Sequence, residues 1–164
     1  MVSRLKPLLL EVIYAKNNEE WFGTKIKFLD YNEGLSAAKK EKKPIMVIVH
    51  HEACEACRIF RPLIGNSTSI LKVHSKLIMT TIEEDDCPPC LILDGRYTPR
   101  VIFLGPNGKV LPEFYNKLGN PRNKYYYHND KSLMHTIEEV TQKFPPECLQ
   151  SHWASKRRKL CYHY

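Results

Sequence analysis

A short apolar run followed at once by two closely spaced cysteines constrains the fold of this chain more than any other feature. The run occupies residues 45–49, directly after Pro44, and is apolar at every position. A run of this length without polar alternation predicts a central strand buried on both faces. Cys54 and Cys57 follow it, and the residues after them can be read as a helix. A cysteine pair at the step from a buried strand into a helix indicates a redox-active site.

The segments around this run predict a β-α-β unit. Residues 21–30 indicate an edge strand, and Asn32 can cap a helix that ends near the lysines at 39–40. After the cysteines, Pro62 should kink a second helix or end its regular part. Residues 77–82 predict the next strand. The apolar residues that the second helix should bury are Ile59, Phe60, Leu63 and Ile64.

The second half of the chain predicts a β-β-α unit. Residues 100–104 form a strand, the Gly-Pro-Asn-Gly sequence at 105–108 a turn, and residues 109–111 the returning arm of a hairpin. Asp130 or Ser132 can cap a last helix, supported by a pair between Glu139 and Lys143. The two halves together predict an α/β fold with a central mixed β-sheet flanked by helices, which is the thioredoxin-like layout.

The two cysteines of the first pair differ in their expected roles. Cys54 would lie at the N-terminal end of the helix, where unpaired backbone N–H groups and the helix dipole favour the thiolate. Cys57, one turn later, can resolve a mixed disulfide. Cys54 is therefore the candidate nucleophile and Cys57 the candidate resolving thiol. The alternatives are two inert buried thiols or two zinc ligands.

Neighbouring side chains should tune this pair. Glu55 places a negative charge beside Cys54 and should raise its pKa, whereas His50, His51 and Arg58 could counter that effect when charged. Further along, Thr98 and Pro99 precede the strand at 100–104. Proline at a strand entrance is compatible with a cis peptide bond, and in thioredoxin-like folds this proline faces the cysteines and binds an extended substrate. Thr98 and Pro99 are therefore the predicted substrate-binding residues.

A second C-x-x-C sequence, Cys87-Pro88-Pro89-Cys90, follows an acidic run and should have no regular structure. With Cys54 and Cys57 it could form a four-thiolate zinc site, although the separation exceeds that of zinc ribbons. It could also form its own disulfide or pass electrons to the first pair. The simplest interpretation is a pair of ordinary loop thiols.

Length and charge bound the remaining possibilities. The chain has 164 residues and a formal charge of +7, four units of which lie in the basic stretch at 156–159, leaving +3 (7 minus 4) for the rest. We interpret that stretch as a solvated tail and expect no specific nucleic-acid partner, no cofactor and no membrane span. The expected organisation is an N-terminal segment at 1–20 that need not be ordered, a domain at 21–146 and a basic tail at 147–164.

The residues resemble a known family beyond the cysteine motif. Residues 44–51 with Cys54 and Cys57, the stretches 95–104 and 106–110, and Gly119-Asn120-Pro121 with residues 124–127 are similar to the anterior gradient family of endoplasmic-reticulum thioredoxin-like proteins, which includes thioredoxin domain-containing protein 12. The resemblance covers residues 21–144. It implies Cys54 as nucleophile, Cys57 as resolving cysteine and Pro99 as the cis-proline. Ala53 departs from the family's usual tryptophan, and Ile48 lies where thioredoxin keeps a buried acid.

The leading functional hypothesis is a thiol–disulfide oxidoreductase that acts on protein cysteines and disulfides. The alternatives are a non-catalytic client-binding module and a zinc-stabilised structural domain that uses both C-x-x-C pairs. The resemblance implies the endoplasmic reticulum lumen or secretion. The sequence shows no clear signal and ends Cys161-Tyr162-His163-Tyr164 without a retention tetrapeptide, so the cytoplasm or nucleus is the alternative location.

Overall fold

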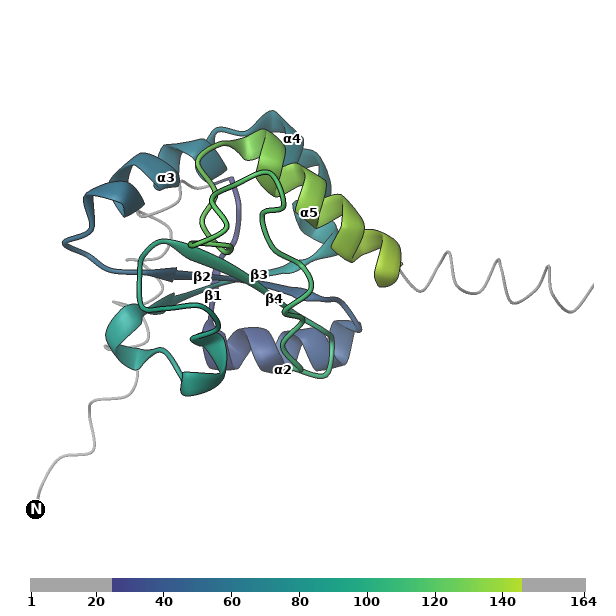
Figure 1. Ribbon diagram of the computed structural model, residues 1–164. Coiled ribbons are helices and arrows are strands. Elements are labelled where there is room, and N and C mark those ends of the chain that lie inside the picture. The colour runs from purple at the N-terminus through teal and green to yellow at the C-terminus, as the bar shows by residue number, and fades with distance from the viewer. Residues whose placement is uncertain (1–24, 146–164) are drawn as a thin grey trace, which may run out of the picture.

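A four-stranded sheet with helices on both faces forms the core of the protein (Figure 1). The structure is a computed structural model and describes residues 25–145. Helix α2 covers one face of the sheet, and α3, α4 and α5 cover the other. The elements in chain order are β1 (Leu29–Asp30), α2 (Tyr31–Glu41), β2 (Ile45–His50), α3 (Glu55–Gly65), α4 (Thr68–Val73), β3 (Ile78–Glu83), β4 (Arg100–Leu104) and α5 (Asp130–Lys143), with 3₁₀ turns at His74–Lys76, Glu84–Asp86 and Pro89–Leu91.

The sheet is mixed, as the sequence predicts. Its strand order is β1-β3-β2-β4, so the apolar run occupies an inner strand. Strand β2 pairs in parallel with β3 and antiparallel with β4. All six β2 residues are buried, because each face of the strand is covered by helices or loops. The carboxyl ends of β2 and β3 meet at the register pair His50 and Glu83, beside the start of α3.

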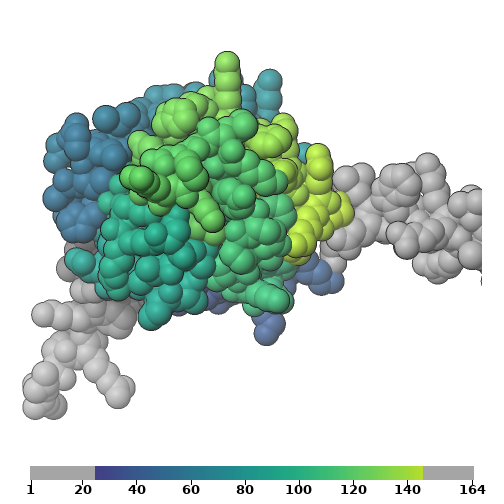
Figure 2. Space-filling model, viewed as in Figure 1, coloured from purple at the N-terminus to yellow at the C-terminus, as the bar shows by residue number. Residues whose placement is uncertain are grey.

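The long connections after β3 and after β4 lie side by side on one face of the molecule, in teal and green in Figure 2. Backbone groups join them: the Lys124 N–H donates to Asp94 Oδ2 at 2.7 Å, and the Tyr125 N–H donates to the Tyr97 hydroxyl at 3.1 Å. The Tyr125 carbonyl in turn accepts from the Val101 N–H at 2.8 Å. These bonds cover part of the exposed edge of β4 and fix the segment that leads into it.

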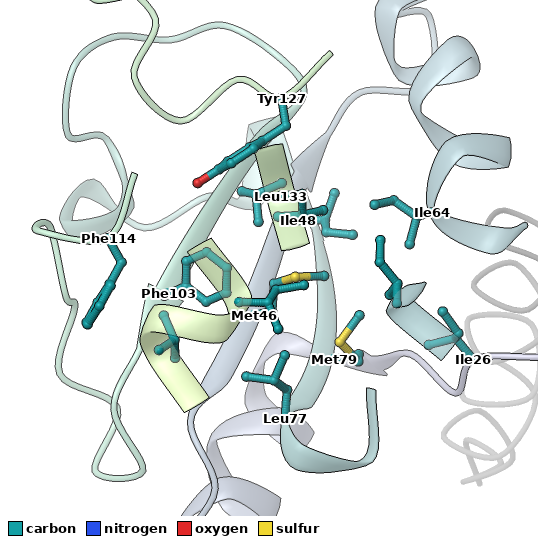
Figure 3. Close-up of a cluster of buried hydrophobic side chains, with 14 of the residues drawn as sticks. Ile26, Met46, Ile48, Ile64, Leu77, Met79, Phe103, Phe114, Tyr127 and Leu133 are labelled. Atoms are coloured by element: carbon teal, nitrogen blue, oxygen red, sulfur yellow. The ribbon is translucent and has the colours of Figure 1, made fainter. Parts of the chain in front are cut away.

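The alternating side chains of β2 and β4 fill two separate cores. Met46, Ile48 and Phe103 point toward α3, α4 and α5 and pack in the larger cluster (Figure 3). Val47 and Ile102 point to the other face and pack with residues of α2 and of the 3₁₀ turn Pro89–Leu91. Burial of each such side chain contributes about 1.5–3 kcal/mol before entropy is counted. The two cores therefore hold α3 and the segment before β4 against one sheet.

Helix caps differ from the predicted ones by one to three residues. Asp30, not Asn32, caps α2, because its Oδ1 accepts from the Glu33 N–H at 2.7 Å. Asn129, rather than Asp130 or Ser132, caps α5 and accepts from the Ser132 N–H at 2.8 Å. Each stretch offers several side chains that can cap, and tertiary packing selects among them.

Three other details of the fold prediction are wrong, and the hairpin and the first strand are confirmed only in part. Ile59 is 66% exposed, because it lies on the solvent face of α3. The predicted hairpin forms in part: Leu104 and Val110 make one antiparallel bridge, flanked by hydrogen bonds from the Gly105 N–H to the Lys109 carbonyl oxygen at 2.8 Å and from the Leu111 N–H to the Phe103 carbonyl oxygen at 2.9 Å. The segment around Cys87, which was predicted to be irregular, contains the 3₁₀ turns Glu84–Asp86 and Pro89–Leu91. The expected pair of α5 is replaced by longer-range pairs, Glu139 with Lys117 and Lys143 with Glu113. Of the predicted first strand, Leu29–Asp30 is a strand, and residues 21–24 lie outside the described part.

Candidate active site

Cys54 lies at the N-terminal end of α3 as its capping residue. Its backbone is extended (φ −81, ψ 115), and its Sγ accepts a hydrogen bond from the Cys57 N–H at 3.2 Å. The side chain is partly exposed, so an incoming sulfur can reach it. The backbone N–H groups at a helix start favour a negative charge on the capping atom. The location is the one predicted for the nucleophile.

Cys57 lies one turn along the same helix and is only 1% exposed. Both cysteines are free thiols. Burial places Cys57 behind Cys54, where the bulk of an incoming protein cannot reach it first. The pair therefore combines one accessible sulfur with one that can act only after the first has reacted.

The surroundings move the pKa values of the two thiols in opposite directions. Burial acts to raise the pKa of Cys54, but hydrogen bonds from the Cys57 and Thr98 side chains and from the Cys57 and Ala56 backbone outweigh it, and the pKa is lowered. Burial raises the pKa of Cys57 to about 11, and hydrogen bonding to the Cys54 side chain acts in the same direction. Cys54 thus carries the more stabilised thiolate, and Cys57 remains a neutral thiol at neutral pH.

Thr98 and Pro99 face this pair from the start of β4. The peptide bond between them is cis, as predicted. The Cys54 thiol donates to the Thr98 carbonyl oxygen at 3.4 Å, which joins residues 44 positions apart in the chain. Thr98 therefore contacts the candidate nucleophile through its carbonyl oxygen, and its side chain acts to lower the pKa of Cys54.

His50 does not supply the positive charge expected of it. It ends β2 and is only 6% exposed. Burial, followed by the charges of Arg61 and His51, lowers the pKa of His50 to about 4, so its imidazole is neutral at neutral pH. Its Nδ1 lies 3.2 Å from Glu83 Oε1, and burial raises the pKa of Glu83. His50 is therefore a neutral, buried imidazole in contact with the half-buried Glu83 side chain near the start of α3.

His51 lies in the loop before Cys54, and Glu55 lies in the first turn of α3 directly after it. Glu55 is exposed and pairs with Arg58 at 3.0 Å. The prediction that Glu55 raises the pKa of Cys54 does not hold, because the hydrogen bonds to the sulfur have the larger effect and lower it. His51 Nδ1 accepts from the Ala53 N–H at 3.2 Å, which fixes the loop that leads into the helix.

An open groove of about 470 Å³ lies beside the candidate nucleophile. Ala53 forms part of its wall, where the family usually has tryptophan, so the groove is wider than an aromatic residue would leave it. Carboxylates outnumber basic groups in its lining. The lining residues are His51, Glu52, Ala53, Arg58, Glu83, Asp85 and Asp86.

Two arginines near the site were not identified from the sequence. Arg61 follows Cys57 by four positions, so both lie on one face of α3. Burial lowers the pKa of the Arg61 guanidinium, and the negative charge of Glu83 acts against that effect. The helical spacing could have indicated this pair. Arg100, the residue after Pro99, is completely buried, and its partners come from a segment whose approach the sequence does not indicate.

The second cysteine pair is not brought to the first. Within residues 25–145, no group of three or more His, Cys, Asp or Glu side chains is placed to hold a metal ion, so the four-thiolate zinc site of Cys54, Cys57, Cys87 and Cys90 is wrong. Cys87 is buried, whereas Cys90 is exposed. The backbone between them is extended at Pro88 (φ −66, ψ 149), so they do not share a helical turn as the first pair does.

Comparisons with known proteins identify the relatives of this chain. Residues 26–106 match the family model described as thioredoxin-like. Anterior gradient protein 2-B of Xenopus laevis is 31% identical over 124 residues, which are 76% of this chain and 70% of that protein. The chain belongs to the anterior gradient family. Anterior gradient protein 3 of Homo sapiens is also 31% identical, over 67% of this chain and 65% of the human protein.

The fold is shared more widely than the sequence. A thioredoxin from Thermus thermophilus superposes with a TM-score of 0.53 at 16% identity, over 85% of this chain and 98% of the thioredoxin. This likeness and the family model establish the thioredoxin-like fold. No helix in the described range, 25–145, is both long and apolar enough to cross a bilayer.

Proposed function

We propose that the protein is a thiol–disulfide oxidoreductase that acts on protein cysteines through Cys54 and Cys57. One observation carries the proposal: an accessible thiol with a lowered pKa lies at a helix start, backed by a buried thiol with a raised pKa. Two inert thiols have no need of such opposite environments. Nucleophilic attack and resolution require this difference, because the thiolate is the attacking species.

The reaction in the reducing direction has two exchanges. The Cys54 thiolate attacks one sulfur of a substrate disulfide, forms a mixed disulfide with it and releases the other sulfur as a thiolate, which takes up a proton. Cys57 then loses its proton and attacks the Cys54 sulfur. The Cys54–Cys57 disulfide forms, and the second substrate sulfur leaves as a thiolate. The substrate gains two electrons and the enzyme loses two; in the oxidising direction the same steps run backwards.

Substrate binding is assigned to the segment at Thr98 and Pro99. Proline lacks an N–H, but the carbonyl of Thr98 and the neighbouring backbone can pair with an extended peptide next to the reacting sulfur. The groove beside Ala53 provides room for the residues that flank the substrate cysteine. Its excess of carboxylates favours flanking residues that are basic or neutral.

Turnover of a protein disulfide tests the proposal. In insulin reduction with a small dithiol as electron donor, Cys54→Ser should fall to the rate of the donor alone, because it removes the nucleophile. Cys90→Ser is the matched control, since Cys90 is an exposed thiol of the other C-x-x-C sequence. It should retain the wild-type rate. A Cys54→Ser variant as active as the wild type would refute the proposal.

A client-binding module without turnover is the second candidate. The observation that favours it is Ala53, which removes the aromatic side chain usual beside the nucleophile and leaves an open groove. In that case Cys54→Ser would leave binding of a reduced client protein unchanged, and no variant would affect insulin reduction. The two candidates therefore differ in the effect of the same substitution.

For location, we propose the lumen of the endoplasmic reticulum or secretion, as the family resemblance implies, with the cytoplasm or nucleus as the alternative. The reduction potential of the Cys54–Cys57 couple bears on this choice. A reduction potential of roughly −180 to −210 mV would match the redox potential of the endoplasmic reticulum. A reduction potential near roughly −270 mV would be that of a thioredoxin that acts as a cytosolic reductant.

A further inference from the structure

A buried arginine lies immediately behind the substrate-binding segment. Arg100 is the first residue of β4 and follows Pro99 directly, and it is 0% exposed. Burial of a guanidinium costs several kcal/mol of desolvation, and an apolar pair of similar volume often gives equal or greater stability. A buried arginine at this location is therefore poorly explained by stability alone.

The Arg100 guanidinium joins the backbone before Thr98 to the segment after β3. One terminal nitrogen donates to the Tyr97 carbonyl oxygen at 2.6 Å. The other lies 2.7 Å from Glu84 Oε2 and 3.5 Å from Cys87 Sγ. Glu84 and Cys87 thus hold one end of the guanidinium while the other end holds the residue before Thr98.

The Tyr97 side chain is fixed independently. Its hydroxyl donates to the Asp94 carboxylate, at 2.8 Å from one oxygen, and accepts from the Tyr125 N–H at 3.1 Å. The Arg100 guanidinium also lies over the Tyr97 ring, 5.8 Å from its centre. Tyr97 is therefore held at its ring, its hydroxyl and its carbonyl, and little freedom remains for the next residue, Thr98.

We propose that Arg100 is a positioning residue that holds Thr98 against the Cys54 sulfur, with Glu84 and Cys87 as its support. The segment that carries Glu84 and Cys87 thereby has a role that requires neither a metal site nor a second redox-active cysteine pair. The inference rests on the proposed function for its biological meaning. Its physical content, control of Cys54 reactivity through Thr98, can be measured whether or not the protein turns over disulfides.

A double-mutant cycle between Thr98 and Arg100 tests this. The readout is the rate of Cys54 alkylation by iodoacetamide near neutral pH in the full chain, assigned to the Cys54 peptide by mass. Thr98→Val removes the hydroxyl that stabilises the thiolate, and should slow alkylation roughly two- to tenfold, the size of one hydrogen bond. Arg100→Lys should slow it by a similar factor, because one ammonium cannot reproduce the planar fork that binds both Tyr97 and Glu84.

The two effects should not add. If Arg100 acts through Thr98, Arg100→Lys in the Thr98→Val background changes the alkylation rate by less than about twofold, within the usual error of additivity. An equal further slowing in the double variant, or no effect of Arg100→Lys in the wild-type background, would overturn the proposal. If Arg100→Lys fails to fold, Glu84→Gln replaces it in the same cycle, because it keeps the arginine and removes only its charged support.

Arg96→Gln is the matched control. Arg96 also contacts Glu84, at 3.5 Å, but its side chain is exposed, and the Tyr97 carbonyl accepts from Arg100 instead. It should leave Cys54 alkylation unchanged, and a slowing equal to that of Glu84→Gln would contradict the proposed route. A protein that shows this non-additivity but no insulin reduction would retain the positioning role of Arg100 and disprove the oxidoreductase proposal.

Discussion

At the residue scale, the two thiols of the candidate site are distinguished by their environments rather than by their sequence. Cys54 is surrounded by hydrogen-bond donors at a helix start, and Cys57 is enclosed by the core. The C-x-x-C spacing and the preceding strand sufficed to predict the position of this pair at the start of a helix. The protonation of His50 could not be predicted, because it depends on burial and on Arg61, a residue 11 positions away in the sequence.

The raised pKa of Cys57 predicts a loss of stability in alkaline solution. In the unfolded chain this thiol ionises near its ordinary value of 9.0, whereas in the folded protein it holds its proton up to about 11. Its contribution to stability is therefore fully present below pH 9 and decreases as the pH rises from 9 to 11. The change should be about 1–3 kcal/mol, the order expected for such a shift.

Urea unfolding of reduced wild type and Cys57→Ala between these pH values measures the effect. The difference in unfolding free energy between the two proteins should shrink as the pH rises, because only the wild type carries this thiol. Groups that do not contact Cys57 titrate alike in both proteins and cancel. A difference that is constant or grows with pH would contradict the assigned environment of Cys57.

At the scale of elements, hydrophobic pattern predicted the strands well and the ends of helices less well. The run at 45–49 and the strand Arg100–Leu104 are found as predicted, since a continuous apolar stretch has few other ways to be buried. The predicted caps were one to three residues away from the observed ones, because several neighbouring side chains can accept the same hydrogen bond. The exposure of Ile59 follows from which face of α3 meets the sheet, which the apolar residues alone did not determine.

Close packing of α2 on the sheet gives a testable prediction. Gly34 lies in α2 against β3, and a Cβ added there would come within 2.0 Å of Thr80 Cγ2. Gly34→Ala should therefore destabilise the protein by about 1–3 kcal/mol despite the higher helix propensity of alanine, because overpacking a buried contact forces neighbours apart. Ser36→Ala, at an exposed position of the same helix, should change stability by less than about 0.5 kcal/mol. Thermal or urea unfolding measures the stability of both variants. A Gly34→Ala variant more stable than the wild type would contradict the close packing of α2 on the sheet.

At the scale of the whole molecule, the sheet brings three distant segments to one end. The start of α3 carries the cysteines, and the segment just before β4 carries Thr98 and Pro99. The 3₁₀ turn Glu84–Asp86, after β3, supports Thr98 and Pro99 through Arg100. The sequence predicted the first two, since each has a recognisable motif. It could not predict the third, because the pairing of Arg100 with Glu84 and Cys87 depends on how the connection after β3 folds back over the sheet.

The central claim is that Cys54 attacks and Cys57 resolves, and trapping the mixed disulfide tests it most directly. Cys57→Ser should accumulate a covalent adduct with a disulfide-containing protein, because the first exchange proceeds and the second cannot. Mass mapping should place the bond at Cys54, and a reducing agent should release it. Cys54→Ser should accumulate none at this site. An adduct at Cys87 or Cys90 in place of Cys54, or equal trapping by both variants, would contradict the account.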